Sequence, residues 1–114
     1  MRPNFFLVIF FIALHLSAQK KYPQNAFRSP LDIPLVLAGT FGELRSNHFH
    51  SGMDIKTQQR EGLPVFAIAD GTVTRIKVSH WGYGKALYVA HPNGNTSVNA
   101  QLQKFGPETE EYVK

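Results

Sequence analysis

The sequence predicts an all-β fold, an antiparallel sheet or sandwich built from hairpins. Runs rich in β-branched and aromatic residues flank two dipeptides, Asp70-Gly71 and Asn93-Gly94. Such dipeptides favour tight hairpins, because a type I′ turn needs positive φ angles at both central positions. No segment shows the sustained 3.6-residue period of an amphipathic helix, and there is no internal repeat. At 114 residues the chain forms at most one domain.

The first half of the chain carries the weaker strand signals. An apolar run at residues 33–37 is expected to form the first strand. A short strand is expected at residues 53–56, followed by a polar loop at residues 57–62.

The second half is expected to contain two hairpins and a short end piece. Residues 65–69 and 72–78 form the first predicted hairpin, and residues 86–90 and 96–102 form the second. Residues 107–111 are expected to form a helical turn or a loop. Three aromatic residues are expected to pack on the sheet with their polar tips in water: Trp81, Tyr83 and Tyr88.

Residues 1–18 have the pattern of a secretory signal peptide. Arg2 supplies the positive charge, residues 5–16 form a nearly all-apolar stretch of 12, and Ala18 is a small residue at the expected cleavage site. The alternative is a membrane anchor, but this stretch is shorter than the ~20 residues that a spanning helix needs. The expected organisation is a signal at 1–18, an extended lead-in at 19–32 and a partial β-domain at 33–114. The expected location is the cell envelope or the exterior.

Charge and cysteine content exclude several classes of function. Without the signal the chain has 11 Lys and Arg against 8 Asp and Glu, a net charge of +3 with no clustered basic stripe. This argues against nucleic-acid binding. The chain has no cysteine, which excludes disulfides and thiolate metal ligands. Any metal must therefore be held by His, Asp or Glu.

His50 and Asp54, with Gly52 between them, are the candidate metal ligands. On a straight strand they would lie roughly 13 Å apart, too far to share an ion at bonds of about 2.0–2.2 Å. The backbone must therefore turn between them, and Gly52 tolerates the positive φ angles that such a turn can require. His50 is expected at the end of a loop and Asp54 at the start of a strand. The alternative is a loop His and a strand-end Asp that make ordinary hydrogen bonds.

The other histidines have simpler expected roles. His80 and His91 lie at strand ends beside turns, and are expected to face solvent or make hydrogen bonds. His48 is two residues from His50 and on a strand would share its face, which leaves a supporting role at the site open beside a surface one.

Four sequence motifs occur in an order that resembles the lysostaphin-type (LytM-type) zinc metallopeptidases, which cut peptide cross-links in peptidoglycan. The motifs are the run Asn47 to Ile55, then Gly62 to Val73, Gly82 to Val89, and His91 to Thr96, and the resemblance extends from about Gly39 to Phe105. The resemblance implies that His50 and Asp54 are the first two zinc ligands. It also implies Zn²⁺ as the cofactor and peptidoglycan peptides as the partner.

The chain departs from this family pattern in two places. Gln101 occupies the position where a catalytic His is expected, and no His-x-His pair is present to supply the third ligand. Catalytic zinc normally has three protein ligands and one open position for water. A weak or incomplete zinc site is therefore expected, in a β-domain that is incomplete at its C-terminus.

Three interpretations follow from these motifs. The first is an incomplete and inactive form of a secreted zinc endopeptidase. The second is a non-catalytic relative that binds peptidoglycan or regulates another wall hydrolase. The third is a secreted β-domain in which His50 and Asp54 are structural. The intact pair favours the first interpretation, and Gln101 favours the second.

Overall fold

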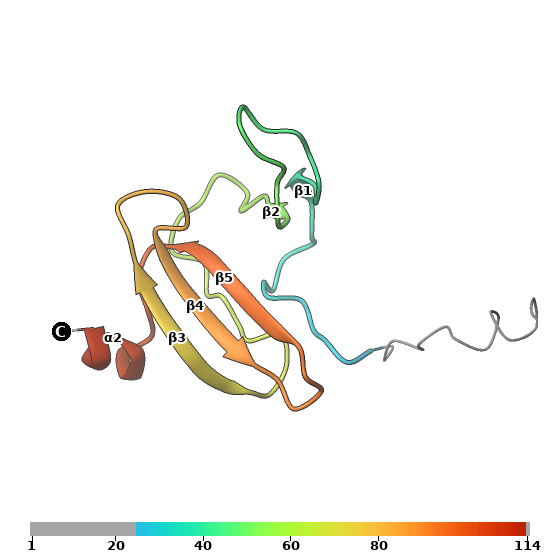
Figure 1. Cartoon of the computed structure of the whole chain (residues 1–114). Helices are drawn as coiled ribbons and strands as arrows, with labels where there is room; N and C mark the ends of the chain where they lie inside the picture. Colours follow the sequence, from blue (N-terminus) through green and yellow to red (C-terminus); the bar gives the residue numbers. More distant parts are fainter. Residues whose placement is uncertain (1–24, 114) are drawn as a thin grey trace, which may run out of the picture.

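The computed structural model describes residues 25–113, which form two antiparallel sheets and one short helix. Figure 1 shows the smaller sheet beside one end of the larger one, with the helix at the far side. The predicted all-β class is confirmed. The predicted signal peptide lies outside the described residues. The elements, in chain order, are β1 (Leu37–Gly39), β2 (Asp54–Ile55), β3 (Thr72–Val78), β4 (Lys85–Ala90), β5 (Thr96–Leu102) and α2 (Pro107–Val113).

The larger sheet has the strand order β3-β4-β5 and holds most of the regular structure. Its central strand, β4, contributes two of the most buried side chains, Ala86 and Val89. The β4–β5 hairpin predicted around Asn93-Gly94 is confirmed. Its turn has one positive φ angle, at Gly94, and closes with a hydrogen bond from the Gly94 amide to the His91 carbonyl (3.0 Å). This is a longer loop than the two-residue type I′ turn.

The predicted hairpin at Asp70-Gly71 is wrong. Residues 65–69 form no strand with β3, and the Phe66 amide instead donates to the Pro30 carbonyl (2.8 Å). The Arg28 amide likewise donates to the Ile68 carbonyl (2.7 Å). Residues 65–69 therefore hydrogen-bond to the lead-in segment, not to β3 as the local pattern predicts.

Gly71 has a packing role in place of the predicted turn role. Its φ angle is not positive. A Cβ atom there would collide with the Ala90 carbonyl and lie 2.8 Å from Val89 Cγ1. The residue is glycine because the backbone passes directly against β4.

The first strand lies further along the chain than predicted. It covers Leu37–Gly39, not residues 33–37, since these are the residues that pair with the two-residue strand β2. The pairs are Leu37 with Ile55 and Gly39 with Asp54, with a register irregularity between them. This small sheet fixes Asp54 beside the segment that follows Gly39.

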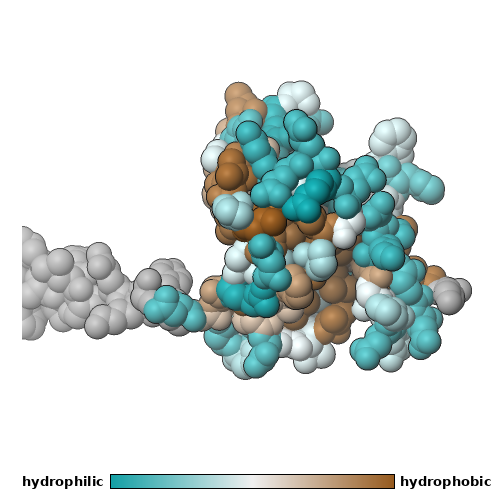
Figure 2. All heavy atoms as spheres, turned by 180° about the vertical axis from the view of Figure 1, so that it is seen from behind, coloured by the Kyte–Doolittle hydropathy of each residue, from teal (hydrophilic) through white to brown (hydrophobic). Residues whose placement is uncertain are grey.

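Few apolar side chains of the described residues are buried. Four form the core: Leu31, Ala86, Val89 and Phe105. Trp81 was expected to pack on the sheet, but it is 87% exposed, so that prediction is wrong. Figure 2 shows apolar residues reaching the surface among polar ones. No helix within residues 25–113 is long and apolar enough to cross a membrane.

Candidate metal centre

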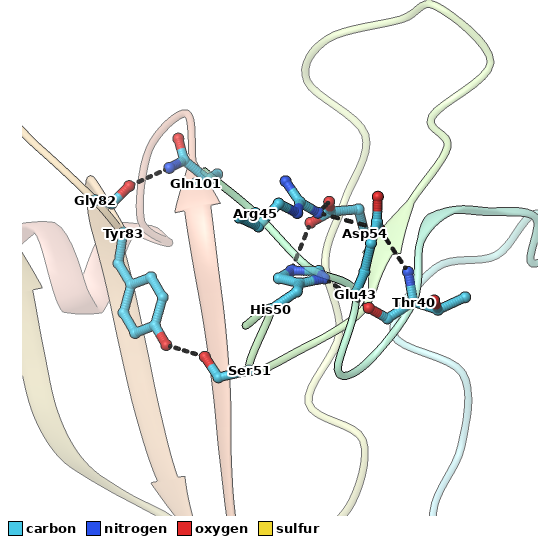
Figure 3. A network of polar contacts seen from close by, with 9 residues as sticks. All are labelled: Thr40, Glu43, Arg45, His50, Ser51, Asp54, Gly82, Tyr83 and Gln101. Carbon is cyan, nitrogen blue, oxygen red and sulfur yellow. Dashed lines mark hydrogen bonds and ion pairs between the residues drawn. The ribbon is translucent and has the colours of Figure 1, made fainter. Parts of the chain in front are cut away.

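His50 and Asp54 come together as the spacing predicts. His50 ends a loop, held by two backbone hydrogen bonds: its amide donates to the Glu43 carbonyl (2.8 Å), and its carbonyl accepts from the Gly42 amide (2.7 Å). Asp54 begins β2. The chain turns between them, so that His50 Nε2 lies 3.3 Å from Asp54 Oδ1 (Figure 3).

The imidazole of His50 is oriented by the backbone. Its Nδ1 lies 3.0 Å from the Thr40 carbonyl oxygen, which can only accept a hydrogen bond. This contact favours the tautomer with the proton on Nδ1, in which Nε2, the nitrogen facing Asp54, would have a lone pair for a metal ion between the two side chains. Metal-binding histidines are commonly oriented in this way, by a carbonyl or carboxylate at the other ring nitrogen.

Arg45 holds the other oxygen of Asp54. Its Nη2 donates to Asp54 Oδ2 at 2.7 Å. This hydrogen bond is the main reason why the pKa of Asp54 lies below its ordinary value of 3.8, and why the pKa of Arg45 is raised. The carboxylate is therefore ionised at neutral pH, the state that a metal ligand requires.

Glu43 completes the cluster. Its Oε2 lies 3.6 Å from Arg45 Nη2 and accepts a hydrogen bond from the Thr40 amide (3.3 Å). Figure 3 shows these side chains converging from the loop and from β2. No sequence motif pointed to Arg45 or Glu43, because their contacts depend on how the loop closes onto β2.

The His50–Asp54 pair fits two ligands of one tetrahedral ion. At bonds of about 2.0–2.2 Å, two such ligands lie about 3.3–3.6 Å apart, and the observed separation is 3.3 Å. However, no group of three or more His, Cys, Asp or Glu residues that could hold a metal occurs within residues 25–113. The described segment thus offers a matched pair of ligands and no third.

The other described histidines have different partners. His91 is buried and bonds to the Asp70 carbonyl and to Ser97 Oγ, both at 2.8 Å, which confirms its predicted hydrogen-bonding role. His48 is exposed and contacts Asn47 Oδ1 at 2.7 Å, and His80 is exposed. None of the three joins the His50–Asp54 pair.

Gln101 lies on β5 with a left-handed backbone (φ 57°), at a bulge where the β4–β5 register shifts. Its side-chain amide donates to the Gly82 carbonyl, and its backbone amide donates to the Tyr83 carbonyl (2.9 Å). Gln101 therefore anchors the 79–84 loop and is turned away from His50 and Asp54 (Figure 3).

The same loop is joined to the candidate metal centre through its tip. Tyr83 OH lies 3.0 Å from the hydroxyl of Ser51, the residue next to His50. This hydrogen bond connects the larger sheet to the loop that carries His50, as Figure 3 shows.

Comparison with known proteins agrees with this fold and with the motifs. Residues 48–114 match peptidase family M23, which is more than half of the chain. The chain therefore belongs to peptidase family M23, and the resemblance seen in the sequence is confirmed.

Relatives that match the chain include the DD-carboxypeptidase/endopeptidase Mpg of Neisseria meningitidis serogroup B and of Neisseria gonorrhoeae. Each is 39% identical over 62 residues, which is 54% of this chain. The match covers 14% of each relative, so this chain corresponds to a small part of those proteins. No solved structure matched the chain.

Proposed function

We propose that this chain carries half of the zinc site of a secreted metalloendopeptidase that acts on peptidoglycan cross-link peptides. One observation carries the proposal: His50 Nε2 and Asp54 Oδ1 lie 3.3 Å apart, while His50 Nδ1, on the opposite side of the ring, lies 3.0 Å from the Thr40 carbonyl oxygen. Family membership supports the peptidase class.

The roles of the residues follow from their contacts. His50 would bind zinc through Nε2 and Asp54 through Oδ1, while Thr40 and Arg45 hold the far side of each ligand. Bound zinc would polarise the scissile carbonyl and lower the pKa of a bound water towards ~7. Gln101 can donate a hydrogen bond, but it cannot act as an acid or base near pH 7.

We infer that the 114-residue polypeptide has no peptidase activity of its own. Residues 25–113 offer no third ligand beside His50 and Asp54, and position 101 is Gln in place of a proton carrier. Each proton-transfer role is worth on the order of 10²–10⁴-fold in rate. The purified chain should leave a cross-link peptide intact when zinc is supplied. Zinc-dependent cleavage by the unmodified chain would contradict the proposal.

A second candidate function is non-catalytic binding of peptidoglycan or regulation of another wall hydrolase. The anchored position of Gln101 favours it. The resemblance implies a catalytic His at position 101, but the side chain present there holds the 79–84 loop. Sedimentation with purified peptidoglycan tests this candidate. Binding without cleavage would support it, and failure to sediment would remove peptidoglycan binding.

Secretion is part of the proposal and has its own test. The charge of Arg2, the apolar stretch at residues 5–16 and the small residue Ala18 predict that the mature chain begins at Gln19. N-terminal sequencing of exported protein should begin at or near Gln19. Exported protein that retains Met1 would contradict a cleaved signal.

A further inference from the structure

We propose that Arg45 is a positioning residue, which turns Asp54 so that Oδ1 faces His50 and is the oxygen offered to a divalent cation, and that Glu43 balances the charge of Arg45. This inference rests on the proposed function, since it assigns the neighbours of the same ligand pair. It concerns Arg45 and Glu43, neither of which is one of the two proposed ligands.

The two oxygens of Asp54 are divided between two partners. Oδ2 accepts from Arg45 Nη2 at 2.7 Å, while Oδ1 faces His50 Nε2 at 3.3 Å. With Oδ2 held by the guanidinium, Oδ1 is the oxygen that faces His50 and has no described hydrogen-bond donor of Arg45 upon it. Partners of this kind around metal ligands typically contribute 10–100-fold in metal affinity.

The guanidinium of Arg45 has one paired and one unpaired nitrogen near the candidate site. Its Nε is buried without a hydrogen-bond partner among the described residues. The guanidinium nevertheless keeps Nη2 directed at Asp54 and towards Glu43. The described ion-pair contacts of Arg45 are thus all made by Nη2, on the side of Asp54 and Glu43.

Glu43 offsets the positive charge that Arg45 places beside the proposed metal site. Without it, the charge of Arg45 would cancel that of Asp54 and weaken the attraction of the cluster for a second cation. With Glu43 3.6 Å from Arg45, the three charged side chains sum to −1. Arg45 can then orient Asp54 without neutralising the site.

Gly39 supplies the space in which this cluster forms. A Cβ atom at position 39 would lie 2.5 Å from Asp54 Oδ2 and 2.7 Å from Arg45 Nη2. Since Gly39 pairs with Asp54 between β1 and β2, the sheet register brings the open position directly against the ion pair.

Zinc affinity of the full chain tests the proposal, measured by competition with a chromogenic chelator. Arg45→Ala should weaken zinc binding by about 10–100-fold. Arg45→Lys should fall between Arg45→Ala and the wild type, because only one guanidinium nitrogen contacts Asp54. Glu43→Gln should weaken binding while leaving the ligand geometry intact. Unchanged or tighter binding in Arg45→Ala would overturn the proposal, since Arg45 would then act only as a repelling charge.

One further measurement and one control variant separate positioning from a general effect on the fold. The visible spectrum of bound Co²⁺ should change in Arg45→Ala and keep its shape in Glu43→Gln. The matched control is Arg28→Ala, which removes an exposed ion pair with Asp32 (2.8 Å) away from the site. This control should match the wild type in zinc affinity and in spectrum, and an equal loss in both arginine variants would contradict a specific role.

A metal-free crystal structure of Arg45→Ala keeps this test independent of the proposed function. If the wild-type chain binds no zinc, the proposed metal site fails, but the orientation of Asp54 can still be read. Rotation of the Asp54 carboxylate away from His50 would support positioning by Arg45. An unchanged carboxylate would overturn it, whether or not zinc binds.

Discussion

Asp54 lies between His50 and Arg45 in the candidate metal centre. Its carboxylate contacts His50 through one oxygen and Arg45 through the other. The sequence was sufficient to predict the turn that brings His50 to Asp54, since Gly52 lies between two potential ligands. It could not predict Arg45, which is nine residues from Asp54 and whose contact depends on the β1–β2 register. The Thr40 contact was missed because it involves a backbone carbonyl, which any residue could supply.

The lowered pKa of Asp54 predicts an acid-dependent loss of stability. The folded state binds the proton less tightly than the unfolded state, whose pKa is near 3.8. The contribution of Asp54 to the free energy of unfolding is therefore present above that value and is lost as pH falls through the folded pKa. Denaturant unfolding in the presence of chelator, from pH 6 to pH 3, should show a shallower acid limb in Asp54→Asn. Parallel profiles would contradict the linkage.

Gln101→His is expected not to create activity. The substitution adds a group that can titrate, but it supplies no third metal ligand at the His50–Asp54 pair. It also removes the amide contact to Gly82, so stability should fall by about 0.5–1.5 kcal/mol, the usual net value of one hydrogen bond. A cleavage assay with zinc and a denaturation curve check both parts. Zinc-dependent cleavage by this variant would show that the site needs only the proton carrier.

At the scale of elements, β3 and β5 have the bounds expected from their β-branched residues. The Asn93-Gly94 signal was also sufficient for the β4–β5 hairpin. The Asp70-Gly71 signal failed because residues 65–69 hydrogen-bond to the distant Arg28 and Pro30, a tertiary contact that no local pattern reveals. The family motifs predicted the M23 class correctly although this hairpin was misassigned.

Gly71→Ala should destabilise the protein by about 1–3 kcal/mol, the typical cost of forcing extra atoms into a packed region. The new methyl would meet the Ala90 carbonyl and Val89 Cγ1 on the central strand. Gly106→Ala is the matched control, because no atom lies within 4 Å of its Cβ position and its φ angle is not positive. Denaturant unfolding compares the two variants. Equal stabilities would show that Gly71 is not needed for close packing.

At the scale of the whole molecule, the described residues leave many large apolar side chains in contact with solvent. Three of them, Phe41, Leu44 and Phe49, lie in the loop that also carries the candidate site and are 68–75% exposed. Contiguous exposed apolar surface favours association. The local sequence patterns could not show which of these side chains would be exposed.

The purified chain is therefore expected to bind a hydrophobic dye and to associate as its concentration rises. Replacing Phe41 and Leu44 together by serine should reduce both effects, because these side chains are 75% and 73% exposed. Dye fluorescence and light scattering over a concentration series measure the change. A wild-type chain that stays monomeric and binds no dye would contradict the expectation.

The most direct test of the central claim, that His50 and Asp54 are two ligands of one zinc ion, is calorimetric titration of the chain with zinc. Weak binding is expected in the wild type, because the described segment offers only two ligands. Binding should be lost in both His50→Ala and Asp54→Asn, and retained in His48→Ala, whose side chain contacts Asn47 instead. Tight, stoichiometric zinc binding that survives His50→Ala would contradict the claim.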